Sequence, residues 1–144
     1  MKSDYQNHTQ KRPMISALSI AGSDSGAGAG IQVDLLTFAA QGVYGTTAIT
    51  CLTAQNPTGV SGIQATPAEF VIEQCQQVIR HFKPCALKTG MLLNTEIVEA
   101  VARLIKQTKI PSVIDPVMVA SSGARLLSSD AIEAVKNSLL PLAT

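Results

Sequence analysis

Short runs of apolar and β-branched residues alternate along this chain of 144 residues with longer segments in which apolar side chains recur every three or four positions. Runs of the first kind predict β-strands, and segments of the second kind predict amphipathic helices. Strands are predicted in this way at residues 15–21, 44–52, 60–65, 86–89 and 112–114. Because strands and helices alternate, we predict an α/β fold with a mostly parallel, doubly wound sheet flanked by helices.

Capping signals mark the predicted helix boundaries. The first helix is expected to end at Gly42, a residue suited to a C-terminal cap. Thr66 and Glu69 have the spacing of a capping box, with Pro67 at the first position of a second helix. Asn94 is the predicted N-cap of a third helix, and a fourth helix follows later in the chain. The first helix should present one apolar face, formed by Ile31, Leu35, Phe38 and Ala39.

Composition and charge exclude several classes of function. The formal net charge is +1 and no basic run is present, so neither nucleic acid nor an anionic membrane surface is an expected partner. No stretch approaches the roughly 20 apolar residues of a membrane span. The cysteines form no Cys-x-x-Cys pair, which is typical of a reducing compartment, and we expect a cytoplasmic protein. Residues 1–13 are polar and predict a disordered tail, followed by one domain over residues 14–144.

A glycine-rich stretch follows the first predicted strand and leads into the first helix. It contains four glycines, at positions 22, 26, 28 and 30. Such a turn lets the backbone approach a ligand closely and directs the free N–H groups of the helix toward it, although a turn that only packs helix on strand is the alternative. It is not a Walker A motif, because Ile31 and Gln32 follow the last glycine instead of Lys and Ser or Thr. It also lacks the spacing of the dinucleotide fingerprint and the acidic residue after the next strand, which argues against a nicotinamide-binding oxidoreductase.

The carboxyl ends of the predicted strands select the candidate site. In a doubly wound sheet, ligands bind outside these ends. Four places follow from this rule: residues 22–30, Gln55, residues 90–91 and residues 115–118. We expect all four to line one edge of the sheet.

Several side chains at this edge suit a flat heterocycle. Gln55 offers a carbonyl acceptor beside an NH₂ donor, which matches the ring nitrogen and exocyclic amine of an aminopyrimidine or adenine edge. The same amide could instead bond the backbone of its own loop. Met91, Val117 and Met118 could sandwich a planar ring or simply pack in the core.

The charged residues nearby also leave two interpretations open. Asp34, about one turn into the first helix, could accept a hydrogen bond from a ligand or face solvent. Asp115 could bind a cation, although Asp-Pro also begins turns. Lys88 lies within an apolar strand, so its ammonium needs an anionic partner, either a phosphate or a carboxylate.

Five segments carry a resemblance to a known family. They are the glycine stretch from Ala21 through Leu35, Ala54-Gln55-Asn56, Lys88-Thr89-Gly90-Met91, Asp115-Pro116-Val117-Met118 and Ser122-Gly123. In this order they resemble the hydroxymethylpyrimidine/phosphomethylpyrimidine kinases of thiamine biosynthesis, which have the ribokinase-like fold. The resemblance covers nearly all of residues 16–141, and the glycine stretch joined to Ala-Gln-Asn is highly specific.

The resemblance implies an enzyme that uses ATP and Mg²⁺ to phosphorylate a small-molecule substrate, 4-amino-5-hydroxymethyl-2-methylpyrimidine, and then its monophosphate. It assigns Gln55 to the pyrimidine edge, and it matches Asp115 to an aspartate that lies near the metal and phosphates in the wider superfamily. The remaining residues of the implied substrate pocket are Gly22, Asp34, Met91 and Val117. At full length, the enzyme is expected to form a homo-oligomer.

Family members are much longer than this chain. The resemblance places the nucleotide site and the catalytic base, in a Gly-Thr-Gly-Cys turn, in a half that these residues do not include. We therefore expect the N-terminal half of such a kinase, with no catalytic residue of its own and no ATP turnover when it is alone. A pyridoxal kinase-type enzyme and a non-catalytic pyrimidine-binding fragment are the alternatives.

Overall fold

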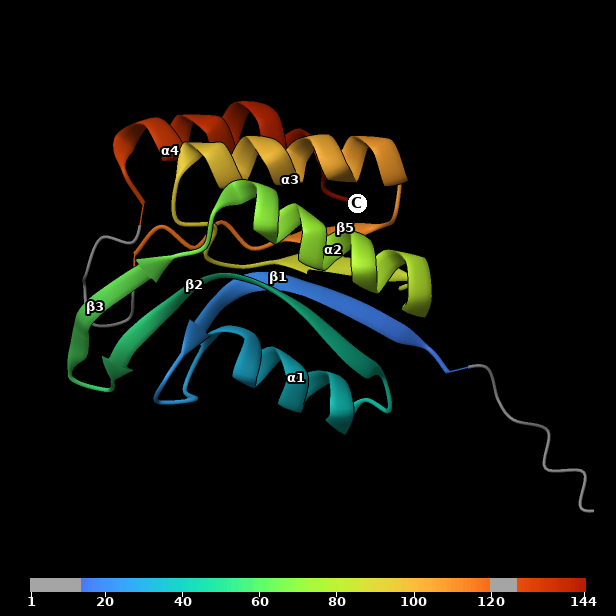
Figure 1. Cartoon of the computed structure of the whole chain (residues 1–144), viewed down its shortest axis with the longest axis horizontal. Helices are drawn as coiled ribbons and strands as arrows, with labels where there is room; N and C mark the ends of the chain where they lie inside the picture. Colours follow the sequence, from blue (N-terminus) through green and yellow to red (C-terminus); the bar gives the residue numbers. More distant parts are fainter. Residues whose placement is uncertain (1–13, 120–126) are drawn as a thin grey trace, which may run out of the picture.

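A five-stranded sheet forms the centre of the computed structural model, which describes residues 14–119 and 127–144 (Figure 1). The strands lie in the order β3-β2-β1-β4-β5, and β3 is antiparallel to β2 while the other pairs are parallel. Their bounds are β1 (Ser16–Asp24), β2 (Tyr44–Asn56), β3 (Gly59–Ala65), β4 (Ala86–Thr89) and β5 (Ser112–Ile114). The predicted bounds of β4 and β5 are confirmed, whereas β1 and β2 continue further into the segments that were predicted to follow them.

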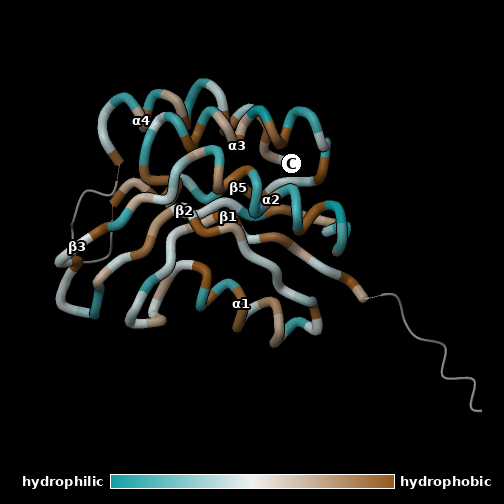
Figure 2. The backbone as a smooth tube through the Cα atoms, in the orientation of Figure 1, coloured by the Kyte–Doolittle hydropathy of each residue, from teal (hydrophilic) through white to brown (hydrophobic). Residues whose placement is uncertain are grey.

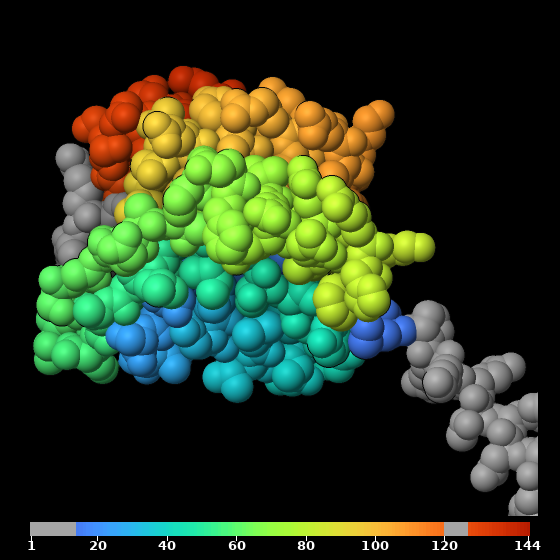
Figure 3. Space-filling view, in the orientation of Figure 1, coloured from blue at the N-terminus to red at the C-terminus, as the bar shows by residue number. Residues whose placement is uncertain are grey.

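Helices cover both faces of this sheet, which confirms the predicted doubly wound α/β fold. One face is covered by α1 (Gly30–Ala40). The other carries α2 (Ala68–Phe82), α3 (Thr95–Thr108) and α4 (Ser129–Ala134), which continues into an irregular helical segment through Leu142. The space-filling view shows α2, α3 and the C-terminal helices side by side as one layer (Figure 3).

The hydrophobic core lies between the sheet and the layer of α2 and α3. Hydrophobic and hydrophilic residues alternate along both helices, as expected for helices with one face on the sheet (Figure 2). The inner face of α3 carries an apolar stripe whose residues are all buried, namely Ile97, Val98, Val101, Leu104 and Ile105. Among the largest fully buried side chains are Leu18, Ile20, Leu87, Ile97, Val98 and Val101.

The opposite face is covered more thinly than the sequence predicted. Ile31 is the buried residue of α1, while Leu35 and Phe38 are half-buried and Ala39 is exposed. Leu35 and Phe38 occupy the space that a side chain at Gly45 of β2 would need. Because Gly45 has no side chain, Leu35 and Phe38 can pack α1 closely against the sheet. The prediction that Ala39 belongs to the same buried face was wrong.

Two predicted caps have different outcomes. At the start of α3, the Asn94 side chain accepts a hydrogen bond from the Ile97 N–H at 2.9 Å, as predicted. The capping box of α2 was wrong, because α2 begins after Pro67 with no side-chain cap. The Thr66 N–H instead donates to the Thr50 carbonyl oxygen at 3.0 Å, which ties this segment to β2.

The order in which the chain adds strands to the sheet changes side at β1. From this strand it moves outward to β2 on one side and later returns to β4 on the other. The carboxyl ends of β1 and β4 therefore frame the crevice in which open α/β sheets bind ligands. In the described residues, no helix is both long and apolar enough to cross a membrane.

Candidate functional site

A cavity of about 540 Å³ opens at the carboxyl ends of the strands. All four places selected from the sequence contribute to its wall. It brings together the six residues that the resemblance assigns to the site, namely Gly22, Asp34, Gln55, Met91, Asp115 and Val117. We call it the carboxyl-edge cavity.

Irregular strand pairing shapes two sides of this cavity. The register between β1 and β2 shifts between Ala21 and Ser23, so Gly22 lies at a bulge. A second shift, in the pairing of β2 with β3, falls between Ala54 and Gln55. Bulges change the direction in which a strand presents its residues, and they are common beside functional sites.

The glycine-rich loop folds around a carboxylate of the same segment. Asp24 is buried, and its side-chain oxygens accept hydrogen bonds from the N–H groups of Gly26 at 2.8 Å and Gly28 at 3.0 Å. The Asp24 N–H donates to Gln32 Oε1 at 3.0 Å, and Gln32 Nε2 donates to Ser23 Oγ at 2.7 Å. The N–H groups of these two loop glycines are therefore not free for a ligand in the cavity.

Asp24 is a residue whose role sequence reasoning missed. An Asp followed two positions later by Gly is typical of a side chain that accepts from nearby backbone N–H groups, so the signal was present in Asp24-Ser25-Gly26. The pattern of glycines drew the prediction toward an external ligand. In the structure, the loop supplies its own anion.

Gln55 is anchored through its backbone and oriented through its side chain. Its N–H donates to Ser25 Oγ at 2.8 Å, and the Ser25 hydroxyl also lies 2.8 Å from the Gln55 carbonyl oxygen. The Thr53 hydroxyl lies 3.2 Å from Gln55 Oε1 and 3.0 Å from the Ser23 carbonyl oxygen. Among the described residues, no partner occupies Gln55 Nε2, so the amide keeps a donor for a ligand in the cavity.

Asp34 is held by two neighbouring strands. Ser19 of β1, which is fully buried, donates to Asp34 Oδ2 at 2.5 Å. Lys88 of β4 places its Nζ 3.1 Å from both Asp34 oxygens and 3.9 Å from Asp115 Oδ2. Of the two partners predicted for Lys88, the structure supplies the carboxylate.

The apolar residues of the site have different positions. Met91 is buried, its carbonyl oxygen accepts from Thr50 Oγ1 at 2.6 Å, and it lines the cavity together with Val117. Met118 instead packs against the hydrophobic core, so the packing interpretation holds for this residue. The resemblance segment Ser122-Gly123 lies outside the described residues.

One buried thiol, Cys51, lies close to the site without lining it, whereas the buried Cys75 belongs to the hydrophobic core. A side chain at Gly22 would meet the Cys51 sulfur, which therefore lies directly beneath the cavity wall. Burial raises the pKa of the Cys51 thiol, and it raises the pKa of Cys75 to about 12. Both thiols are consequently protonated near neutral pH, as expected for structural cysteines.

The described residues contain no group of three His, Cys, Asp or Glu side chains arranged to hold a metal ion. Asp115 contributes a single, half-exposed carboxylate, and its charged neighbour is the Lys88 ammonium. Mg²⁺ prefers octahedral oxygen ligands, often one or two carboxylates completed by water and substrate phosphates. These residues therefore do not form a Mg²⁺ site by themselves.

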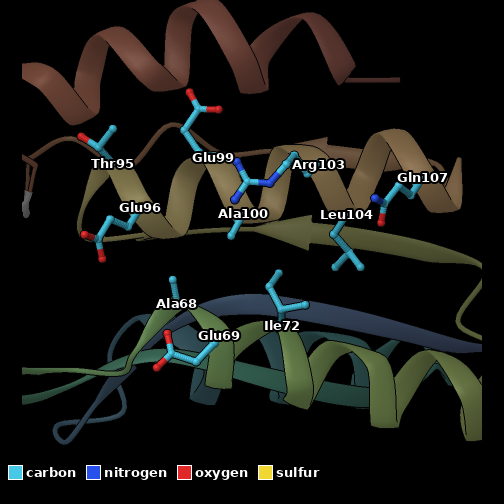
Figure 4. A pocket seen from close by; sticks show the side chains of 10 residues that line it. All are labelled: Ala68, Glu69, Ile72, Thr95, Glu96, Glu99, Ala100, Arg103, Leu104 and Gln107. Atoms are coloured by element: carbon cyan, nitrogen blue, oxygen red, sulfur yellow. The ribbon is translucent and has the colours of Figure 1, made fainter.

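A second hollow, of about 780 Å³, lies between α2 and α3 (Figure 4). Its wall includes the glutamates Glu69, Glu96 and Glu99 together with Arg103 and the apolar side chains Ile72 and Leu104. It shares no lining residue with the carboxyl-edge cavity. The residues predicted for chemistry all lie at the carboxyl edge instead.

The sequence matches a known protein family over most of its length. The family model described as phosphomethylpyrimidine kinase matches residues 24–144. The chain belongs to the phosphomethylpyrimidine kinase family. A relative in this family, the hydroxymethylpyrimidine/phosphomethylpyrimidine kinase of Synechococcus elongatus, is 56% identical over 128 residues, which are 89% of this chain and 49% of the relative. The chain thus spans about half the length of the curated relatives that carry this name.

Solved structures show the same ribokinase-like fold. The phosphomethylpyrimidine kinase of Clostridium difficile has a TM-score of 0.84 and 42% identity, over 90% of this chain and 56% of that one. A pyridoxal kinase of Staphylococcus aureus in complex with pyridoxal has a TM-score of 0.80 and 33% identity, over 91% of this chain and 48% of that one. The phosphomethylpyrimidine kinase family therefore shares its architecture with kinases named for a second flat heterocycle.

Proposed function

We propose that this chain forms the pyrimidine-binding part of a kinase that transfers phosphate from ATP to 4-amino-5-hydroxymethyl-2-methylpyrimidine and to its monophosphate, in thiamine biosynthesis. The observation that carries the proposal is the gathering of the predicted substrate residues around one cavity in a chain of this family. The cavity volume lies within the range of small-molecule sites, and it is framed by the strand ends at which such sheets bind ligands.

The cavity suggests how the pyrimidine is held. Met91 and Val117 supply apolar contacts for the faces of a planar ring, and Gly22 of β1 forms part of the same wall. The Gln55 amide pairs with the ring nitrogen and the exocyclic amine, in an orientation supported by the Thr53 hydroxyl. Asp34 accepts a hydrogen bond from the hydroxymethyl group, because a carboxylate can accept more bonds than Ser19 and Lys88 supply.

ATP and Mg²⁺ enter the proposal through the family. Phosphoryl transfer depends on holding donor, metal and acceptor in line, and the residues of this chain bind and orient the acceptor. A Mg²⁺ ion would neutralise charge on the phosphates, but Asp115 offers it one carboxylate beside a lysine. The metal assignment of Asp115 therefore stays a prediction from the resemblance.

Three further parts of the proposal are predictions of the same kind. They are a domain over residues 14–144, a cytoplasmic location and a homo-oligomer for the full-length enzyme. Residues 1–13, expected to form a disordered tail, lie outside the described residues.

A pyridoxal kinase-type activity is the second candidate. The observation in its favour is the similarity to solved pyridoxal kinases. The TM-score is 0.80 for the Bacillus subtilis enzyme and also 0.80 for the Staphylococcus aureus enzyme in complex with pyridoxal. Pyridoxal is also a flat ring with a hydroxymethyl group, so the apolar walls of the cavity suit both substrates. The amide edge of Gln55 favours the aminopyrimidine, which offers an acceptor and a donor side by side.

Calorimetric titration of this chain with hydroxymethylpyrimidine and with pyridoxal tests the proposal. We expect saturable binding of the pyrimidine, with pyridoxal at least about tenfold weaker, the effect of one well-made hydrogen bond. Tighter binding of pyridoxal would favour the second candidate. A chain that folds and binds neither compound would contradict both.

A further inference from the structure

An ammonium group lies between two carboxylates at the wall of the carboxyl-edge cavity. Lys88 Nζ lies 3.1 Å from both oxygens of Asp34 and 3.9 Å from Asp115 Oδ2. Within the described part of the chain, Lys88 is the only cationic side chain that lines this cavity, whereas Asp24, Asp34 and Asp115 are anionic. The charge of the cavity wall therefore depends strongly on this one residue.

The position of the ammonium is built into the fold. Lys88 and Ser19 are paired in register on β4 and β1, and both side chains reach the same carboxylate of α1. A Cβ atom at Gly90 would lie 3.1 Å from Lys88 Nζ, so the glycine leaves the space that the ammonium fills. Lys88 side-chain exposure is 23% and that of Asp34 is 15%, which makes this pair less screened than a surface ion pair.

The two substrates of the proposed reactions differ in charge at the group that lies beside Asp34 and Lys88. The first substrate presents a neutral hydroxyl, whereas its monophosphate presents a dianion on the same carbon. Asp34 can accept a hydrogen bond from the hydroxyl, but its negative charge repels the phosphate. A site that takes both compounds needs a cation beside this carboxylate, and Lys88 is within contact distance of it.

We propose that Lys88 is a positioning and specificity residue that allows the cavity to accept the phosphorylated substrate. This inference rests on the proposed function. With the neutral alcohol bound, the ammonium holds Asp34 in place as an acceptor. With the monophosphate bound, it contacts the phosphate and offsets the charge of Asp34 and Asp115.

The test compares two ligands on this chain by calorimetry: hydroxymethylpyrimidine and its monophosphate. The measured quantity is the ratio of the monophosphate Kd to the alcohol Kd. We expect Lys88→Met to raise this ratio by about tenfold or more, because a unit charge acts mainly on the charged ligand. Lys88→Arg, which keeps the charge, should change the ratio by less than about threefold. Lys106→Met is the matched control, since Lys106 is exposed on α3 and lies outside the cavity.

A double variant distinguishes an effect of the Lys88 charge from an effect of misfolding. The pair Asp34→Asn with Lys88→Met removes both members of the ion pair, and we expect the ratio to fall back toward the wild-type value. Raising the salt concentration should weaken monophosphate binding in the wild type more than in Lys88→Met. If Lys88→Met weakens both ligands equally, Lys88 is only structural and the inference is wrong. If the folded wild-type chain binds neither ligand, the proposed function itself fails and this inference with it.

Discussion

The backbone of Gly30 lies directly against the carbonyl oxygen of Gly22, where the glycine-rich loop returns from β1 to begin α1. Gly30 also adopts a φ of +61°, in the left-handed region that favours glycine. This contact brings the start of α1 close to the carboxyl end of β1. The width of the carboxyl-edge cavity therefore depends on the absence of a side chain at residue 30.

Gly30→Ala should destabilise the fold far more than an alanine at another glycine with positive φ. Gly42 is the matched control, because its φ is +71° and no atom lies within 4 Å of a Cβ placed there. Gly42→Ala should cost about 1–2 kcal/mol of unfolding free energy, the usual penalty for this backbone region. Gly30→Ala adds a steric overlap with backbone and should cost at least about 3 kcal/mol. Urea unfolding of both variants measures the difference, and equal costs would contradict the contact.

Gln55→Ala should weaken pyrimidine binding without unfolding the chain. The lost amide leaves polar groups of a buried ligand unpaired, which costs about 1–3 kcal/mol of binding free energy. Gln64→Ala is a suitable control, since Gln64 is exposed on β3 and does not line the cavity. Calorimetry on the two variants, with circular dichroism to confirm folding, gives the comparison. If Gln55→Ala binds the pyrimidine with wild-type affinity, Gln55 does not contact the ligand.

Substitution by valine should change the unfolding free energy differently at two buried threonines, Thr50 and Thr89. Both are fully buried, but Thr50 donates to the Met91 carbonyl oxygen at 2.6 Å, whereas the Thr89 hydroxyl has no hydrogen-bond partner among residues 14–119 and 127–144. Thr89→Val should therefore leave the unfolding free energy unchanged or raise it by up to about 1 kcal/mol, while Thr50→Val should lower it by about 1–3 kcal/mol. Thermal or urea unfolding decides the matter. A larger loss in Thr89→Val than in Thr50→Val would show that Thr89 is in fact hydrogen-bonded, for example to buried water.

Local patterns in the sequence were sufficient for most of the fold. The alternation of apolar runs gave β4 and β5 their observed bounds, and the Asn94 cap followed from its residue type at a helix start. The rule for strand ends then selected residues that do line one cavity. These features depend on neighbours along the chain or on the general geometry of parallel sheets.

Contacts between distant segments were harder to predict. Thr66 has the residue type of a cap, but its N–H is taken by Thr50 of a neighbouring strand. The partner of Lys88 is 54 positions away in the sequence, and periodicity left a phosphate and a carboxylate equally open. Only the register of β1 with β4 and the approach of α1 determine which anion lies beside Lys88.

The three cysteines should differ in reactivity toward a thiol reagent. Cys85 is exposed, whereas Cys51 and Cys75 are fully buried. Burial raises the pKa of Cys75 to about 12 and also raises that of Cys51, so the folded chain holds both as protonated, unreactive thiols near neutral pH. We expect one rapidly modified thiol in the native chain and three after unfolding. Cys85→Ser should abolish the rapid phase, and its persistence would show that a buried cysteine becomes accessible.

The last prediction is that this chain binds the pyrimidine but does not turn over ATP. In the described residues, the N–H groups of Gly26 and Gly28 are bonded to Asp24, and the cation of the cavity is paired with Asp34. The loop N–H groups are therefore not free to hold the phosphates of a nucleotide, and the Lys88 ammonium is engaged at the acceptor while the acceptor is bound. Alignment of donor and acceptor can supply about 7–11 kcal/mol of the barrier to such a reaction, so binding the acceptor alone should not be enough.

A coupled assay for ADP with hydroxymethylpyrimidine and MgATP measures this directly. The full-length Synechococcus elongatus relative, assayed in parallel, serves as the positive control. We expect this chain to bind the pyrimidine by calorimetry yet to form no ADP above the rate without substrate. Substrate-dependent ADP formation within about tenfold of the control, a difference of only about 1.4 kcal/mol in the barrier, would contradict the prediction. In that case the described residues would have to hold ATP as well, and the Asp24 carboxylate would have to release the loop N–H groups when the nucleotide binds.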